Sequence, residues 1–290
     1  MLTIDRNHGL DAETRFAEIY RNLTVYDFPW DMNQALSFAL FRTYAVPSVG
    51  RLLAQTAEFT DNVQRRYDDT ALLLEVPLLE GFSSPEGKSA IRRINQMHKR
   101  YDISNDDMLY VLATFVVVPK RWIDSYGWRK LTYDEVVASV RYYQTLGKHM
   151  AITDIPDTYE DFAHLMDDYE REHFAFDADA VKVADSTLGL LKTFYPKPLA
   201  PVIDIFSRSL MDEPLLDAFH YREPGRLARR LSVAGLRARA RFVALLPSRR
   251  KPLLVHEMPR IRSYPNGFEV SRLGTFAPGC PVAHSSAKAG

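Results

Sequence analysis

The sequence contains one cysteine, Cys280, in 290 residues. A single thiol cannot form an intramolecular disulfide or a cysteine-rich zinc site, so both are excluded. No apolar run reaches the roughly 18 residues that a transmembrane helix needs, and the N-terminus lacks the basic stretch, apolar run and cleavage site of a secretory signal. We therefore expect a reducing, cytoplasmic environment and no transmembrane segment.

The sequence also lacks an excess of charge of either sign, because 37 Lys and Arg residues balance 37 Asp and Glu residues. No overall field steers the chain toward nucleic acid, which we do not expect as a partner. One basic stretch, residues 226–251, alternates arginines with leucines. This stretch is typical either of a solvated face or of a helix that contacts an anionic membrane peripherally.

Persistent polar and apolar alternation with paired turn signals, which would indicate strands, is missing as well. Apolar residues recur instead with the 3.6-residue period of helices, and they make up 46% of the chain. This pattern predicts an all-α fold, a single large helical bundle over residues 1–270. Residues 271–290, rich in Ala, Ser, Gly and Pro, are expected to form a disordered tail.

Capping residues and prolines delimit the expected helices. Their ranges are 11–23, 31–44, 47–75, 90–101, 105–118, 132–150, a helix starting at 157, and then 178–194, 199–219 and 222–245. Short strands are expected near 253–256 and 268–270. The segment 108–118 is apolar nearly all round, is too short to cross a bilayer, and should stop at Pro119.

His98 lies in the apolar stripe of the helix at 90–101. At 100° per residue, it shares one side with Ile91, Ile94, Met97 and Tyr101, whereas the arginines and lysines fall on the other side. An inward imidazole loses hydration and needs a hydrogen-bond partner or a metal, and a neutral imidazole is a good iron ligand. The pattern is compatible with two roles for His98, a hydrogen-bonded core histidine or a ligand of a metal or haem.

Arg66 and Thr70 lie four residues apart and share a helix face with two leucines. A guanidinium and a hydroxyl on such a face suit the binding of dioxygen, superoxide or a carboxylate, because each supplies a fixed donor. The alternative is a salt bridge between Arg66 and a nearby acid. Glu170 and His173 have the spacing of di-iron bundles, but those sites need a second such motif and two more carboxylates.

Several segments together resemble the mpaB-type oxygenases, a family related to the rubber oxygenases, or latex-clearing proteins. The similarity rests on RRYDDT at 65–70, GKSAIRRINQMH at 87–98, ISNDDMLYVLATF at 103–115, PKRWIDSYGWR at 119–129 and ITDIPDTYEDF at 152–162, and it continues through Tyr169 and Glu170. It covers residues 40 to 175 most closely, and the combination is specific although no single segment is.

The resemblance implies an all-α fold around a buried haem b, with His98 as the proximal iron ligand and Arg66 and Thr70 on the dioxygen side. In the rubber oxygenases, a lysine directly before that threonine can cap the resting iron. Asp69 occupies this position here, so no lysine-capped state is expected. Arg92, Arg129 and Lys148 are candidate anchors for the haem propionates, on charge type alone.

We therefore expect a haem b-dependent oxygenase that uses dioxygen to oxidise a C=C bond of an apolar, isoprenoid-like small molecule. The expected pocket lining is Met108, Val111, Leu112 and Phe115. Two alternatives remain open: a haem-binding sensor or storage protein without turnover, and a helical interaction protein without haem. The fungal mpaB enzymes carry a membrane anchor that we do not expect here. Cys280 lacks the spacing of a cytochrome P450 thiolate loop, which favours a surface thiol.

Overall fold

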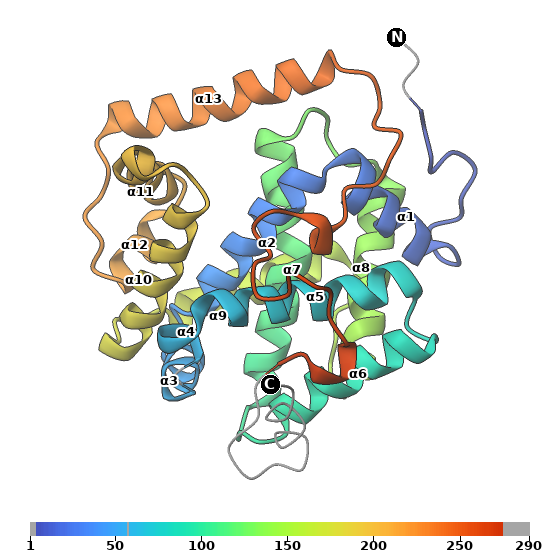
Figure 1. Ribbon diagram of the computed structural model, residues 1–290, viewed down its shortest axis with the longest axis horizontal. Helices are drawn as coiled ribbons and strands as arrows, with labels where there is room; N and C mark the ends of the chain where they lie inside the picture. Colours follow the sequence, from blue (N-terminus) through green and yellow to red (C-terminus); the bar gives the residue numbers. More distant parts are fainter. Residues whose placement is uncertain (1–3, 57, 275–290) are drawn as a thin grey trace.

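The computed structural model describes residues 4–56 and 58–274. Every regular element within these residues is helical and none is a strand, which confirms the predicted all-α class (Figure 1). Most of the expected tail, residues 275–290, lies outside the described residues, and so does Cys280.

The helices begin and end as follows. They are α1 Phe16–Asn22, α2 Pro29–Thr43, α3 Pro47–Gln55, α4 Glu58–Asp61, α5 Val63–Glu80, α6 Pro85–His98, α7 Asn105–Tyr126, α8 Tyr133–His149, α9 Tyr159–His173, α10 Ala178–Thr193, α11 Ala200–Ser209, α12 Glu213–Ala218 and α13 Arg226–Ala244. A π-helical turn, Leu23–Asp27, joins α1 to α2, and 3-10 turns form at Lys197–Leu199, Val255–Glu257 and Val270–Arg272.

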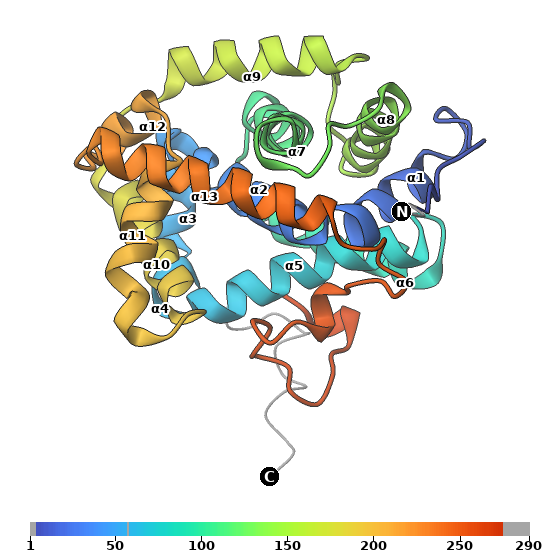
Figure 2. The ribbon, with the colours of Figure 1, turned by 90° about the horizontal axis from the view of Figure 1, so that it is seen from above.

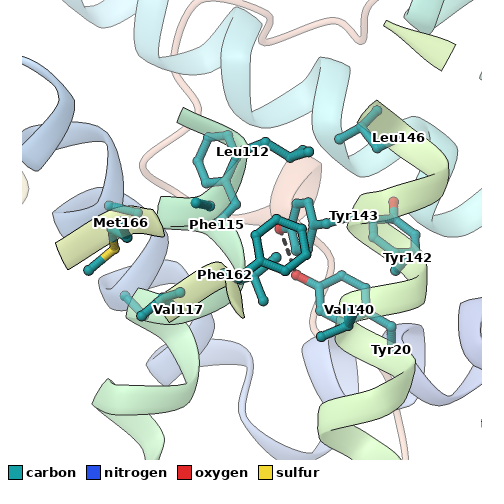
Figure 3. Packing of buried hydrophobic residues seen from close by; sticks show 14 of the residues in the cluster. Tyr20, Leu112, Phe115, Val117, Val140, Tyr142, Tyr143, Leu146, Phe162 and Met166 are labelled. Carbon is teal, nitrogen blue, oxygen red and sulfur yellow. Dashed lines mark hydrogen bonds between the residues drawn. The ribbon is translucent and has the colours of Figure 1, made fainter. Parts of the chain in front are cut away.

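Helix α7 lies at the centre of the main core. It packs most extensively against α2 and also contacts α8, α9 and α13, as Figures 1 and 2 show. In the close-up of Figure 3, Tyr20 and Tyr143 meet with their hydroxyl oxygens 2.8 Å apart among apolar side chains. A second cluster of apolar residues joins α2 and α4 to α10 and α12.

The start of α7 follows the prediction, but its end does not. The Ser104 hydroxyl accepts the Asp107 N–H at 3.0 Å and so caps the helix. The predicted stop at Pro119 is wrong, because α7 continues to Tyr126. A proline removes one helical hydrogen bond, and the burial of Trp122 and Ile123, 6% and 1% exposed, favours continuation beyond it.

Other expected boundaries are also corrected. The single helix at 47–75 is three helices, since Asn62 leaves helical geometry with φ −128° and ψ 35°, and α5 then runs through Pro77 to Glu80. The helix at 199–219 is interrupted where Asp212 caps α12. The predicted strands are wrong: 3-10 turns form at 255–257 and 270–272, and the described chain offers no strand for them to pair with.

The described chain stays packed beyond residue 270, where the tail was expected to start. Leu273 is fully buried against α5 and α6, and its carbonyl accepts the Arg93 Nε–H at 2.9 Å. The Asp68 carboxylate accepts the backbone N–H groups of Arg262 and Ser263 at 3.0 and 2.8 Å. The C-terminal segment 260–274 therefore packs along one side of the α5–α6 pair.

A buried ionic contact joins α2, α7 and α9. The Arg42 Nε–H donates to Glu170 Oε1 at 2.7 Å, and the Tyr110 hydroxyl donates to the same oxygen at 3.1 Å. The pKa of Arg42 is raised: burial opposes this, but the hydrogen bond and the charge of Glu170 outweigh the burial. Glu170 is thus occupied by a structural contact.

We expect Arg42→Met to lower the free energy of unfolding by about 3–5 kcal/mol, because it leaves the Glu170 carboxylate buried without its counter-charge. Urea denaturation measures the change. Arg121→Met is the matched control, since the Arg121–Asp167 pair is nearly half exposed and its loss should cost less than about 1 kcal/mol. Equal losses in the two variants would contradict a stabilising role for the buried pair.

Candidate functional site

Helices α5 and α6 form the frame of the candidate site. Ser84 caps α6 by accepting the Gly87 N–H at 2.8 Å, and the two helices bury Leu72, Leu73, Ala90 and Ile94 in one cluster. Only the short connection 81–84 separates the helices. As a result, His98 at the end of α6 returns to Arg66 near the start of α5, close enough for the two groups to interact electrostatically.

Arg66 and Thr70 are brought together as the sequence predicted. The Arg66 Nη1–H donates to Thr70 Oγ1 at 2.5 Å, and the Thr70 hydroxyl donates to the Arg66 carbonyl at 2.8 Å. The guanidinium carbon lies 5.1 Å from the centre of the Phe59 ring. Burial lowers the pKa of Arg66, and the neighbouring Tyr44, Asp69, Glu58 and Tyr101 oppose that shift.

The alternative of a salt bridge from Arg66 is not what the structure shows. Although Glu58 and Asp69 are near enough to influence Arg66, neither pairs with it in the described part of the chain. The Asp69 carboxylate accepts the Tyr264 hydroxyl instead, and burial raises the pKa of this carboxyl. The Arg66 guanidinium therefore has donor capacity that no acid occupies.

His98 is mostly buried and electrically neutral. Burial, and then the nearby charge of Arg66, lowers the pKa of the imidazole to about 4. Its Nδ1 is buried and finds no hydrogen-bond partner among residues 4–56 and 58–274. A satisfied core histidine would need such a partner, so the geometry does not support that alternative.

Three buried polar atoms without hydrogen-bond partners gather around Arg66. They are His98 Nδ1, Glu58 Oε2 and Asp69 Oδ2, and all three residues interact electrostatically with Arg66. An unsatisfied buried polar group costs about 1–3 kcal/mol, so a cluster of them calls for an explanation such as a bound ligand, ion or water. This cluster is the chemical centre of the candidate site.

The expected pocket lining lies on α7. Leu112 and Phe115 are buried, whereas Met108 and Val111 are half-buried. Phe115 stacks on Tyr143 of α8 with ring centres 5.8 Å apart, near the middle of Figure 3. A hollow of about 460 Å³ lies along α6 beside His149, but His98 and Arg66 do not line it. A haem-lining role for the four α7 residues stays a prediction.

The remaining features that the sequence suggested do not form a metal site, a free anion anchor or a membrane span in the described residues. No cluster of three His, Cys, Asp or Glu residues in the described chain is placed to hold a metal ion. Arg129 is occupied by Asp27 and Glu135, both at 2.7–2.8 Å, so it is not a free anchor for an anion. Within the described residues, no helix has both the length and the apolar character to cross a membrane.

Sequence reasoning missed Glu58 and Tyr264. Glu58 was assigned to the middle of one long helix, but it begins the short helix α4 beside Arg66. Tyr264 belongs to the C-terminal segment, nearly 200 residues from its partner Asp69. No local pattern marks either residue. Tyr264 reaches Asp69 through long-range packing, and Glu58 lies beside Arg66 because the chain leaves helical geometry at Asn62, between α4 and α5.

The lowered pKa of His98 predicts acid sensitivity. Because the unfolded imidazole takes up a proton near pH 6.5 and the folded one only near pH 4, the unfolded state binds more protons between these values. The free energy of unfolding should therefore fall as the pH drops from 6.5 to 4, by up to about 3 kcal/mol from this group. Denaturation of the wild type and His98→Gln at several pH values isolates the effect; parallel losses in both proteins would contradict it.

Comparisons with known proteins agree on one family. Residues 30–245 match the family described as ER-bound oxygenase mpaB/B'/Rubber oxygenase, catalytic domain. The ER-bound oxygenase mpaB' of Penicillium brevicompactum is 29% identical over 224 residues, which cover 71% of this chain and 53% of that protein. The ER-bound oxygenase mpaB of Penicillium roqueforti is also 29% identical over 224 residues, covering 71% of this chain and 75% of that protein.

A third relative, the ER-bound oxygenase mpaB of Penicillium brevicompactum, is 31% identical over 141 residues. These residues cover 47% of this chain and 36% of that protein. The aligned region thus spans about half the length of the first relative and about a third of the third. The match includes α5, α6 and α7, which contain the predicted site residues.

Proposed function

The chain belongs to the mpaB and rubber oxygenase catalytic-domain family, and from this membership we propose that it is a haem b-dependent oxygenase. The proposed reaction is the oxidation of a C=C bond in an apolar, isoprenoid-like molecule by dioxygen. Family membership supports oxygenase activity. The single observation that supports the cofactor is the group of unpartnered polar atoms around Arg66, which includes His98 Nδ1.

The residues present fit the cofactor chemically. A neutral imidazole with a free nitrogen is what iron requires of a histidine ligand, and His98 has a pKa of about 4 and no hydrogen-bond partner in the described chain. It lies at the end of α6, where the residue is mostly but not fully buried. His98 is thus the residue that would hold the iron.

When bound, haem b supplies the iron at which dioxygen is activated. Arg66 and Thr70 supply the polar groups nearby: the guanidinium is held by its hydrogen bond to Thr70 and lies over Phe59. Donors fixed in a buried, water-poor place interact strongly with developing negative charge, because the low local polarity screens them little. We assign Arg66 the role of the donor that would orient dioxygen and stabilise negative charge that develops on it.

The substrate class rests on the apolar character of the two helical surfaces that we expect to line the site. Helix α7 between Leu109 and Val117 is almost entirely apolar and buried, and the α5–α6 interface is aliphatic. A site of this kind favours an apolar molecule through the release of water from both surfaces. Oxidation at a double bond is the part of the proposal that comes from the family.

Oxygen uptake by the haem-supplemented protein tests the proposal. We expect uptake with short polyprenols or unsaturated terpenoids and none with their saturated counterparts, with oxygenated products identified by mass spectrometry. Haem-loaded protein that consumes no oxygen across this panel would contradict the enzyme assignment and favour a sensor or storage protein. Colourless protein from haem-replete cells would favour an interaction protein.

A further inference from the structure

Helix α13 lies along the outside of the molecule and is fixed there by one face (Figures 1 and 2). Leu236 and Ala240 are buried on this inner face, 4% and 8% exposed. The Arg239 Nη1–H groups reach the Asp31 carboxylate at 3.1 and 3.2 Å, and the guanidinium lies 3.7 Å from the ring centre of Trp30. These contacts of the inner face hold the helix in place, and the outer face takes no part in them.

The outer face of α13 consists of two parallel stripes. At 100° per residue, each stripe spans an arc of about 60°, and the two arcs lie next to each other. The first contains the exposed arginines Arg226, Arg230, Arg237 and Arg241. The second contains Leu227, Leu231, Phe242 and Leu245, which are 70%, 63%, 63% and 66% exposed. Bulky apolar side chains that are this exposed over a whole helix indicate a surface that is covered in use.

The charged residues within this segment of the sequence have one sign. From Arg226 to Lys251 the sequence has nine basic residues and no acidic one, although the whole chain is neutral. In the described chain, none of the four arginines of the basic stripe forms an ion pair. The basic stripe also borders a hollow of about 430 Å³, which Arg229 lines as well. The Arg229 Nε is buried there without a hydrogen-bond partner, whereas its Nη2 lies 3.5 Å from Glu223 Oε1.

We propose that the outer face of α13 docks on an anionic lipid bilayer. The arginine stripe would bind lipid phosphates, and the leucine and phenylalanine stripe would enter the region between head groups and acyl chains. Nineteen helical residues give a straight contact about 28 Å long, and two stripes that run side by side along it suit a flat, negatively charged surface. A second copy of this chain fits less well, because its arginines would face these arginines.

Flotation with vesicles tests the proposal without haem or substrate, so its outcome is independent of the proposed oxygenase function. Wild-type protein should bind vesicles of 70% phosphatidylcholine and 30% phosphatidylserine but not pure phosphatidylcholine, and added salt should weaken binding. The triple variant Arg230→Gln, Arg237→Gln, Arg241→Gln should bind about 100-fold more weakly, at about 5-fold for each charge. Phe242→Ser with Leu231→Ser should also bind at least about 10-fold more weakly.

Matched controls remove the same kinds of side chain, charged or bulky, from other surfaces of the protein. The triple variant Lys130→Gln, Arg171→Gln, Lys182→Gln removes three exposed charges, and Tyr133→Ser removes a ring that is 81% exposed; both should bind like wild type. Wild-type protein that does not float with anionic vesicles would overturn the proposal. So would controls that weaken binding as much as the α13 variants, or a lipid-free dimer that the Phe242→Ser, Leu231→Ser variant converts to a monomer.

Discussion

Replacing His98 with alanine should weaken haem binding by at least about 100-fold. Loss of a hydrogen bond that merely supports a metal ligand already costs about 10–100-fold in affinity, and His98 is proposed to be the ligand itself. The fold should persist, because the imidazole makes no hydrogen bond in the described chain whose loss would destabilise it. Haem titration followed by the Soret absorption measures the affinity, and circular dichroism checks the fold.

His149→Ala is the matched control for this variant. His149 ends the neighbouring helix α8 and is exposed, with its ring stacked on Phe82 at 5.5 Å. It should bind haem like the wild type. If His98→Ala bound haem as tightly as the wild type while His149→Ala did not, the assignment of the ligand would be wrong even if the protein binds haem.

Arg66→Met should leave haem bound and reduce oxygen-dependent turnover by about 10²–10³-fold. This is the usual cost of removing one preorganised donor from a developing negative charge, and methionine retains much of the apolar bulk beside Phe59. Thr70→Val should have a smaller effect, because the hydroxyl positions the guanidinium. Oxygen uptake and Soret intensity, measured on the same samples, separate turnover from cofactor retention.

Arg65→Met provides the control for Arg66→Met, since Arg65 is its exposed neighbour on α5. A second measurement does not depend on activity. Because the charge of Arg66 helps to lower the pKa of His98, the imidazole of the haem-free Arg66→Met protein should titrate at a higher pH than in the wild type, as NMR would show. Full turnover in Arg66→Met would contradict the role assigned to this guanidinium.

Local chemistry explains why several helix starts could be predicted. Thr132 and Glu135 form the expected reciprocal capping box at the start of α8, and Ser104 caps α7 as its position before two acids indicated. These contacts involve residues only three apart, so the sequence displays them directly. The helix ends were less predictable, since burial decides whether α7 continues past Pro119.

The site was predictable in part. The 3.6-residue period alone placed His98 on an inward face, and the spacing of Arg66 and Thr70 placed these two on one face of α5. Their proximity to His98 depends on how α5 packs on α6, which only the family resemblance indicated. The role of the C-terminal segment could not be predicted, because the contacts of Asp68 and Asp69 with residues 262–264 join positions almost 200 residues apart. The role of Glu58 depends on the break at Asn62, which no local signal marked.

Haem binding is tested most directly by the absorption spectrum of the wild-type protein after saturation with haem and removal of the excess by gel filtration. If His98 and Arg66 form a haem site, a Soret band that corresponds to one haem per chain elutes with the protein. A protein that elutes colourless after this treatment, while circular dichroism shows its helices intact, would contradict the claim that His98 and Arg66 form a haem site.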